Sequence, residues 1–469
     1  MTNSIKTARS IDWLTLVLYL SLVAIGSLMI YAAEYQVSET GEYVFSWSSA
    51  VGRQFIWTGI ALIAFIITFL FDSKFWNTFA YPIYFLTTFA LFLVLIFGEE
   101  IKGSKSWFII FGFSFQPAEF AKLGTALAIS AYLSYHKTSL KVRKHILLSC
   151  LIFLTPSALI LLQPDAGSAL VFFSFFIVMF REGLNPYFYL LLFFLAALFI
   201  GSLLLPITSI LLILTCIANA FLLNLYKTKP QALTFFYIAL LIVSVIALFI
   251  GINKELLVAN SLLLVALAGI QLRTGRFRPL FLLLPMLLVF SGLAYSSQYV
   301  FENVLEPHQQ NRINDWLRPS LSDPQGTIYN VRQSTLAIES GGFKGKGFLQ
   351  GTYTKLNYVP EQSDDFIFST IGEEQGFLGA FGIIVIFVLL MLRLTILAER
   401  SRLPFGRIFA YGVAGILFFH FFVNIGMSMG LVPVIGIPLP FISKGGTSLL
   451  AFSILIAIIL KQDSKRYSL

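Results

Sequence analysis

Two adjacent carboxylates, Asp364 and Asp365, stand immediately before the apolar residues Phe366, Ile367 and Phe368. One of the two should therefore sit where the chain passes from water into apolar surroundings. A carboxylate at such a boundary is suited to accept a proton from a hydroxyl group, which is the task of a general base. The alternative interpretation is a solvated acid pair at an interface, with no chemical role.

A second candidate pair is Glu119 and Lys122, which follow Pro117 at the start of an apolar run. Their spacing of three residues places both side chains on one face of a helix. This arrangement has two interpretations, and the sequence leaves both open. The pair either joins two helices as a buried ion pair or presents a cation to an anionic substrate.

Two further polar stretches interrupt apolar runs. Asp165 follows Pro164 at a helix start, where helix capping is the favoured interpretation on spacing alone. The stretch from Gly436 to Ser448 is rich in Gly and Pro, and irregular backbone survives at membrane depth only where protein or a water-filled cavity covers it. Asn424 and Lys444 would bind a ligand or satisfy that backbone, and the second role is favoured. His420 is predicted to be a core residue with hydrogen-bond partners.

The elements that carry these residues follow from composition. Of 469 residues, 57% are hydrophobic and only 12% are charged. A soluble core cannot absorb that share, so soluble enzymes, nucleic-acid readers, disordered scaffolds and disulfide-rich secreted domains are excluded. A membrane-spanning helix needs about 20 apolar residues. We therefore predict an all-α, polytopic integral membrane protein of about 14 transmembrane helices.

The predicted spans are the apolar runs of about 17 residues or more. They cover residues 11–33, 55–71, 79–97, 118–135, 146–163, 165–180, 186–205, 207–225, 232–252, 255–272, 279–297, 377–397, 405–429 and 447–461.

The distribution of basic residues orients these spans. Cytoplasmic loops carry an excess of Lys and Arg, and most of the 32 in this chain fall on the inner side if the amino end is cytoplasmic. Both termini are then predicted to be cytoplasmic, in a single membrane domain of residues 1–469. Residues 298–376 form one large extracytoplasmic loop. The net charge of +9 reflects this bias, so we expect no nucleic-acid partner.

Eight motifs occur in order between Trp107 and Ser448. They are SFQPAEFAKL (114–123), QPDAGSAL (163–170), NRI (311–313), QSTLAIESGG (333–342), PEQSDDFIF (360–368), IGEEQG (371–376), NIGM (424–427) and GIPLPFISKGG (436–446). With these motifs the sequence resembles the shape, elongation, division and sporulation (SEDS) family of bacterial polytopic glycosyltransferases. It is more similar to the members that act in elongation than to those that act in division.

The resemblance implies a peptidoglycan glycosyltransferase of the bacterial inner membrane. Such an enzyme polymerises lipid II into glycan strands, with its active site on the extracytoplasmic side. It also implies a ten-helix core, so that the region 186–297 contains about four extra helices. The implied partners are the lipid II substrate, a class B penicillin-binding protein with transpeptidase activity, and the elongation machinery. A divalent cation, Mg²⁺ or Mn²⁺, would suit the diphosphate of the substrate.

The resemblance also assigns residues. Asp365 matches the outer-loop aspartate proposed as catalytic, which selects it as the general base. The expected substrate-binding residues are Arg53, Trp107, Gln116, Glu119, Lys122, Asp165, Glu361 and Lys444. Four positions depart from the family pattern: Ser106 replaces a frequent Arg, Ser363 a usual His, Asp364 a usual Thr, and Lys444 a usual Tyr.

Two other functions fit the composition. Buried charges and broken helices also occur in transporters, for instance a flippase for a lipid-linked cell-wall precursor. Against this, all the polar clusters lie on the predicted outer side, whereas transporters present polar groups to both sides. A non-catalytic scaffold would leave the polar residues replaceable.

Overall fold

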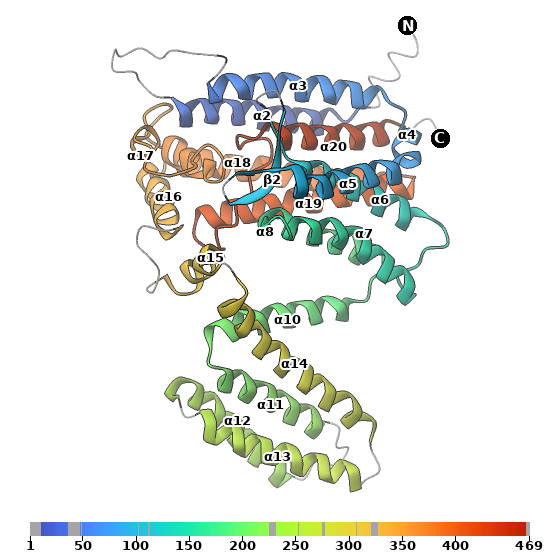
Figure 1. The fold of residues 1–469 in the computed structure, drawn as a ribbon, viewed down its shortest axis with the longest axis vertical. Coiled ribbons are helices and arrows are strands. Elements are labelled where there is room, and N and C mark those ends of the chain that lie inside the picture. Colours follow the sequence, from blue (N-terminus) through green and yellow to red (C-terminus); the bar gives the residue numbers. More distant parts are fainter. Residues whose placement is uncertain are drawn as a thin grey trace. The chain divides into compact units, whose positions relative to one another are not determined.

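The structure is a computed structural model that describes residues 11–35, 47, 49–101, 103–110, 113–224, 231–251, 253–273, 277–305, 307–319 and 327–465. Helices make up most of these residues (Figure 1). The two termini, residues 1–10 and 466–469, were predicted to be cytoplasmic and lie outside the described residues.

Eleven helices within the described ranges are long and apolar enough to cross a membrane. At 1.5 Å per residue, 20 helical residues match the roughly 30 Å of a bilayer core. These helices are α2 (Trp13–Glu34), α3 (Ala50–Leu70), α5 (Ala80–Phe97), α7 (Arg143–Leu161), α10 (Pro186–Leu204), α11 (Ile207–Asn224), α13 (Asn253–Arg273), α14 (Arg278–Asn303), α18 (Ile367–Arg400), α19 (Pro404–Ser428) and α20 (Gly446–Ser464).

The other three predicted spans are also helical, but they do not join this group. Helix α6 (Pro117–Ser134) carries Glu119 and Lys122 and is less apolar. The span predicted at 165–180 is divided into α8 (Ala166–Val171), η1 (Phe172–Ser174) and α9 (Phe175–Arg181). Helix α12 (Gln231–Ile250) has a shorter apolar part, Thr234–Leu248. A polytopic helical protein is therefore confirmed, while the exact number of fourteen stays a prediction.

A small antiparallel sheet corrects the expectation of an all-α chain. Its strands are β1 (Glu99–Ile101), β2 (Ser104–Ile110) and β3 (Phe113–Phe115), in the order β1-β2-β3. Glu99 pairs with Trp107, and Phe108 pairs with Phe115. β-Branched and aromatic residues favour such strands. The remaining helices are α4 (Ser73–Thr78), α15 (Pro307–Leu317), α16 (Thr327–Gly341) and α17 (Thr352–Lys355).

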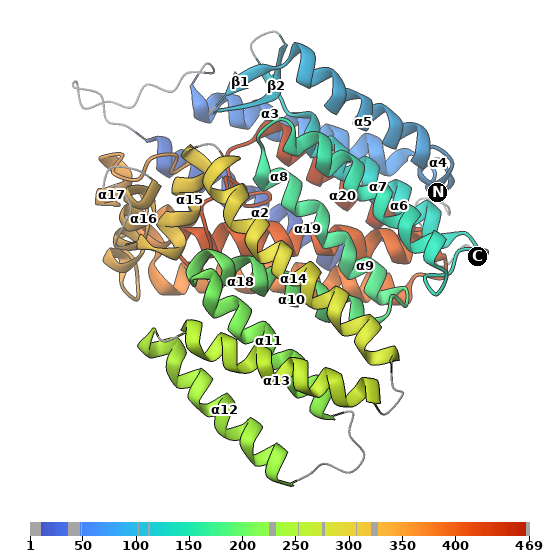
Figure 2. The same cartoon turned by 60° about the horizontal axis from the view of Figure 1, so that its bottom comes forward.

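The chain divides into two compact units. The first holds the described residues up to Asn185 and from Asn314 onward, and it contains every candidate site residue. Within it, α20 packs along α3, α5 along α6, and α18 along both α19 and α2 (Figures 1 and 2). The second unit covers Pro186–Ile313. The predicted assignment of extra helices to 186–297 is not tested by this division and stays a prediction.

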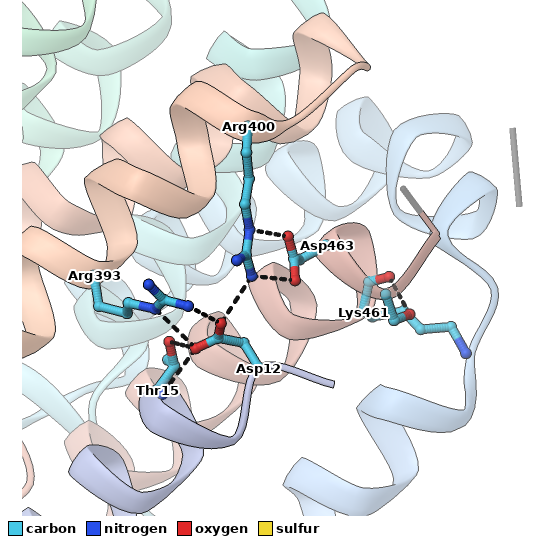
Figure 3. Close-up of polar contacts among 7 residues, drawn as sticks. Asp12, Thr15, Arg393, Arg400, Lys461 and Asp463 are labelled. Carbon is cyan, nitrogen blue, oxygen red and sulfur yellow. Dashed lines mark hydrogen bonds and ion pairs between the residues drawn. The ribbon is translucent and has the colours of Figure 1, made fainter. Parts of the chain in front are cut away.

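An ionic cluster fastens three helices of the first unit at one end (Figure 3). Asp12 caps α2 through the Thr15 amide at 3.0 Å and also accepts from Arg393 Nη2 at 2.5 Å and Arg400 Nη2 at 2.8 Å, both from α18. Arg400 in addition binds both carboxylate oxygens of Asp463 on α20, at 2.7 and 2.6 Å. Both aspartates are buried.

The second unit packs around a buried amide. Asn260 of α13 donates from Nδ2 to Ser244 Oγ of α12 at 2.9 Å, and its carbonyl accepts from Asn219 Nδ2 of α11 at 3.0 Å. Tyr237 donates to the Cys216 carbonyl at 2.9 Å. Apolar residues from α11 to α14 surround these contacts. Polar pairs of this kind join helices where no water competes.

Candidate active site

The site is centred on the turn that leads into α18. Asp364 and Asp365 are partly exposed, whereas the next three residues, Phe366, Ile367 and Phe368, are at most 3% exposed. The carboxylate pair therefore lies where the chain enters its buried core, as the sequence indicated. Which of the two residues does chemistry is not decided by this placement.

A re-entrant segment between α19 and α20, residues 436–445, holds that turn in place. Ser443 Oγ donates to the Asp364 carbonyl at 2.5 Å, and the Lys444 amide donates to the Ser363 carbonyl at 2.9 Å. Gly436 has φ +66°, and a Cβ added there would lie 3.5 Å from Asp365 Oδ2. The glycine thus provides a left-handed turn beside the carboxylate.

Helix α19 holds the same segment from the other side. Asn424 Nδ2 donates to the carbonyls of Ile437 at 2.8 Å and Asp365 at 2.9 Å. One turn earlier, His420 Nδ1 lies 3.0 Å from the Pro438 carbonyl. Asn424 therefore satisfies irregular backbone, as the sequence favoured, and His420 is the partnered core residue that it predicted.

Glu119 and Lys122 form a buried ion pair on α6. The Lys122 ammonium lies 2.7 Å from Glu119 Oε1 and 2.9 Å from His420 Nε2. Lys122 is 1% exposed and Glu119 2%. The spacing on one helix face is confirmed, and the pair also joins α6 to α19. A direct role in substrate binding stays a prediction.

Asp165, at the start of α8, contacts Gln116, at the start of α6. Gln116 Nε2 donates to Asp165 Oδ2 at 3.0 Å, while Asp165 Oδ1 caps α8 through the Ser168 amide at 3.0 Å. A Cβ added to Gly167 would come within 2.2 Å of the Ile435 carbonyl. This close approach brings Asp165 beside the beginning of the re-entrant segment. Asp165 is therefore a helix cap that is also near the site.

Sequence reasoning missed Glu34, the last residue of α2. Its Oε1 accepts from Lys444 Nζ at 2.9 Å and from Ser363 Oγ at 2.7 Å. Lys444 and Ser363 both depart from the family pattern, and Asp364, which also departs from it, is bound by Ser443 next to Lys444. Three of the four departures thus lie together. Nothing in the local sequence around Glu34 indicates this contact.

The remaining predicted residues are not brought to Asp365 by a described contact. Arg53 is exposed on the first turn of α3, next to Gln54, whose Oε1 accepts from the Gly445 amide at 3.4 Å. Trp107 is partly buried on β2 of the sheet. Glu361 is exposed in the turn before Asp365, with φ +56°. Their predicted roles in binding stay predictions.

Two buried carboxylates on α18 fix the loop 345–355. Glu373 accepts from Lys346 Nζ at 2.7 Å and from the Tyr353 and Thr354 amides at 2.9 Å each. Glu374 Oε2 accepts from the Leu349 amide at 3.1 Å. A buried carboxylate of this kind is stable because backbone donors and a cation satisfy it. These contacts hold loop 345–355 against the helix that follows Asp365.

The described residues hold no cluster of the side chains that most often bind a divalent cation. In this part of the chain, no three His, Cys, Asp or Glu side chains are grouped as a metal site would require. Hard cations such as Mg²⁺ need several oxygen ligands. The part that a divalent cation would play here therefore stays a prediction.

Comparisons with known proteins agree on one family. The model of the FtsW, RodA and SpoVE family, described as "Cell cycle protein", matches residues 12–212 and 204–468. Peptidoglycan glycosyltransferase RodA of Treponema pallidum is 29% identical, over 98% of this chain and 99% of that protein. Peptidoglycan glycosyltransferase MrdB of Escherichia coli is 40% identical over 35% of this chain and 44% of its own length.

Solved structures show the same fold. A protein in the structure titled "Structural coordination of polymerization and crosslinking by a peptidoglycan synthase complex" has a TM-score of 0.64 and 25% identity, with 97% of this chain and 98% of that chain covered. The crystal structure of the rod shape determining protein RodA of Thermus thermophilus has a TM-score of 0.55 and 23% identity, with the same coverage.

Proposed function

The chain belongs to the FtsW, RodA and SpoVE family of cell cycle proteins, and from this premise we propose that it is a peptidoglycan glycosyltransferase that polymerises lipid II during cell elongation. One observation supports this activity most directly. The motif segments 424–427 and 436–446 contact the turn that carries Asp365, and the motif segment 114–123 is joined to the second of them through the contacts of Lys122 with His420 and of His420 with Pro438.

In the proposed reaction, a sugar hydroxyl of one lipid II attacks the anomeric carbon of a second. A new glycosidic carbon–oxygen bond forms, the bond to the diphosphate breaks, and undecaprenyl diphosphate leaves with the bonding electrons. Asp365 accepts the proton of the attacking hydroxyl as general base. A cation near the substrate diphosphate strengthens its binding, and Lys444, one-third exposed, is the residue that we propose for this role.

The orientation of the helices supports an extracytoplasmic site. Helices α2, α18 and α20 run from the site, at Glu34, Ile367 and Gly446, to the ionic cluster with Arg393 and Arg400 at their other ends. The end rich in Arg and Lys belongs in the cytoplasm. The site would then face the outer side of the bacterial inner membrane, where lipid II is polymerised.

The direct test is an assay of purified protein with lipid II. We expect glycan polymer from the wild type and a loss of on the order of 10²-fold or more in Asp365→Asn, as removal of a general base implies. The matched control is Asp364→Thr, which changes the neighbouring carboxylate to the usual family residue and should retain most activity. Normal polymerisation by Asp365→Asn would remove that residue from the mechanism.

The same preparation separates the alternative functions. A wild type that makes no polymer but moves a lipid-linked precursor across the membrane of vesicles would be a flippase, and the enzyme proposal would fail.

We also propose a class B penicillin-binding protein as partner, because the synthase-complex relative joins polymerisation to crosslinking. The assay should therefore be run with and without that transpeptidase, and with and without a chelator of divalent cations.

A further inference from the structure

The contacts of Lys122 leave its ammonium closed to a ligand in this structure. It donates to Glu119 Oε1 at 2.7 Å and lies 2.9 Å from His420 Nε2. It also lies 5.4 Å from the ring centroid of Phe452, which packs edge-on against the His420 ring. With 1% of its surface exposed, Lys122 acts on its protein neighbours.

The same contacts assign the tautomer of His420. An ammonium group has only donors, so Nε2 must accept with its lone pair. Nδ1 then carries the single ring proton and donates it to the Pro438 carbonyl, 3.0 Å away. His420 is therefore a neutral imidazole with a fixed ring orientation. Lys122 donates to its Nε2, and its Nδ1 donates to the backbone carbonyl of Pro438.

This backbone is the part of the chain that locates Asp365. His420 and Asn424 stand four residues apart on α19, and they bind the consecutive carbonyls of Pro438 and Ile437. Asn424 donates from the same amide nitrogen to the Asp365 carbonyl at 2.9 Å. A shift of Pro438 would therefore move the neighbouring Ile437 carbonyl, which Asn424 binds. Because Asn424 also binds the Asp365 carbonyl, Asp365 would move with it.

We propose that His420, oriented by Lys122, is a positioning residue for Asp365. It keeps residues 436–445 in the conformation that presents the Asp365 carboxylate to the attacking hydroxyl. This inference rests on the proposed function, and it deepens that function. It also gives the buried pair on α6 an indirect role, through His420, in place of a contact with the substrate diphosphate.

The first experiment compares two replacements of His420 in the lipid II polymerisation assay. His420→Phe fills the ring volume but loses both nitrogens, and we expect kcat to fall on the order of 100-fold with KM within about 2-fold, since small misplacements of a reacting group cost this much. His420→Gln keeps an amide donor for Pro438 and should fall by less than about 10-fold. A residue that only fills space would give the opposite order, with Phe tolerated better than Gln, and that order would overturn the proposal.

Two controls make the result specific. His145 lies in the first turn of α7, at the end of that helix opposite to Asp165, and its Nδ1 is 2.8 Å from the Tyr132 hydroxyl. His145→Phe should therefore keep the wild-type kcat. Each variant must elute as the wild type does and unfold in a single transition. If His420→Phe fails this criterion, His420→Gln decides. A fall in kcat of more than about 10-fold in a His420→Gln protein that folds as the wild type does would contradict the proposal, because the amide still supplies a donor for the Pro438 carbonyl.

The second experiment asks whether Lys122 acts through His420. The neutral double variant Glu119→Gln/Lys122→Met removes the ion pair without leaving one buried charge alone. We expect kcat to fall as in His420→Phe, and adding His420→Phe should lower it no further, because coupled residues are non-additive. Multiplied losses with a raised KM would mean that Lys122 binds the substrate directly, and they would overturn the indirect role. A wild type without polymerase activity would instead refute the proposed function itself.

Discussion

At the scale of single residues, Lys444 differs from the usual family residue, and its contacts lead to a prediction about substrate binding. Its ammonium has three donors, of which one is directed to Glu34 at 2.9 Å, and the side chain is 33% exposed. The other donors can reach a bound anion at the end of α2. Because Ser363 binds the same Glu34 oxygen, the contact also steadies the turn before Asp365.

We predict that Lys444→Met raises the KM for lipid II about 10-fold, which corresponds to about 1.4 kcal/mol, with a smaller change in kcat. The reason is the loss of a cation near the diphosphate. Lys105→Met is the matched control, since Lys105 is an exposed lysine on the sheet whose ammonium binds the Ile96 carbonyl. Equal KM values for Lys444→Met and the wild type would exclude Lys444 from substrate binding.

Residue contacts were predictable where partners are close in sequence. Glu119 and Lys122 are three residues apart, and helix periodicity alone places them together. Glu34 lies 329 residues from Ser363 and 410 from Lys444, so no local pattern connects it to the site. The role of His420 depends on contacts with α6 and the re-entrant segment, and only the assembled helices bring these together.

At the scale of elements, the membrane helices were predictable because each needs an apolar run that soluble loops do not have. Two elements carry a weaker signal in the sequence. Helix α6 is shielded within the first unit and so tolerates Glu119 and Lys122, which weakens its apolar signal. The three-stranded sheet is short, with strands of three to seven residues, and its pattern is hidden between two long apolar runs.

The ionic cluster of α2, α18 and α20 makes a prediction about stability. Burial would raise the pKa of Asp12, but hydrogen bonds from Arg393, Thr15 and Arg400 outweigh burial and hold the pKa well below its usual 3.8. A carboxylate whose pKa is depressed by folding stabilises the protein above the unfolded pKa, and that contribution is lost as pH falls. We expect Asp12→Asn to lower the free energy of unfolding by about 2 kcal/mol at neutral pH.

The measurement is the thermal unfolding of purified protein in detergent at several pH values. The difference between Asp12→Asn and the wild type should stay constant at neutral and mildly acidic pH and shrink only below about 3.8, where unfolded Asp12 becomes protonated. Asp72→Asn is the control, because the Lys465–Asp72 pair is exposed and such pairs contribute little. A stability difference that grows on acidification would contradict this account.

At the scale of the whole molecule, the distribution of charge determines which side of the membrane the site faces. The first unit carries Asp365 and the re-entrant segment at one end of α18 and α20, and Arg393, Arg400 and Asp463 toward the other. If the basic end is cytoplasmic, lipid II can reach Asp365 only from the outer side. The enzyme proposal therefore depends on the direction in which the chain crosses the membrane.

Cysteine labelling in intact cells can decide that direction. The two native thiols are Cys150 and Cys216, both on helices, and replacing both with Ala gives a background without reactive thiol. Lys355→Cys, at the exposed end of α17 near the site, should react with a membrane-impermeant maleimide from outside. Lys137→Cys, exposed between α6 and α7, should react only after the cells are opened, because the positive-inside rule places it in the cytoplasm. The reverse pattern would put Asp365 in the cytosol, away from the growing glycan, and polymerisation of lipid II by this protein would then be excluded.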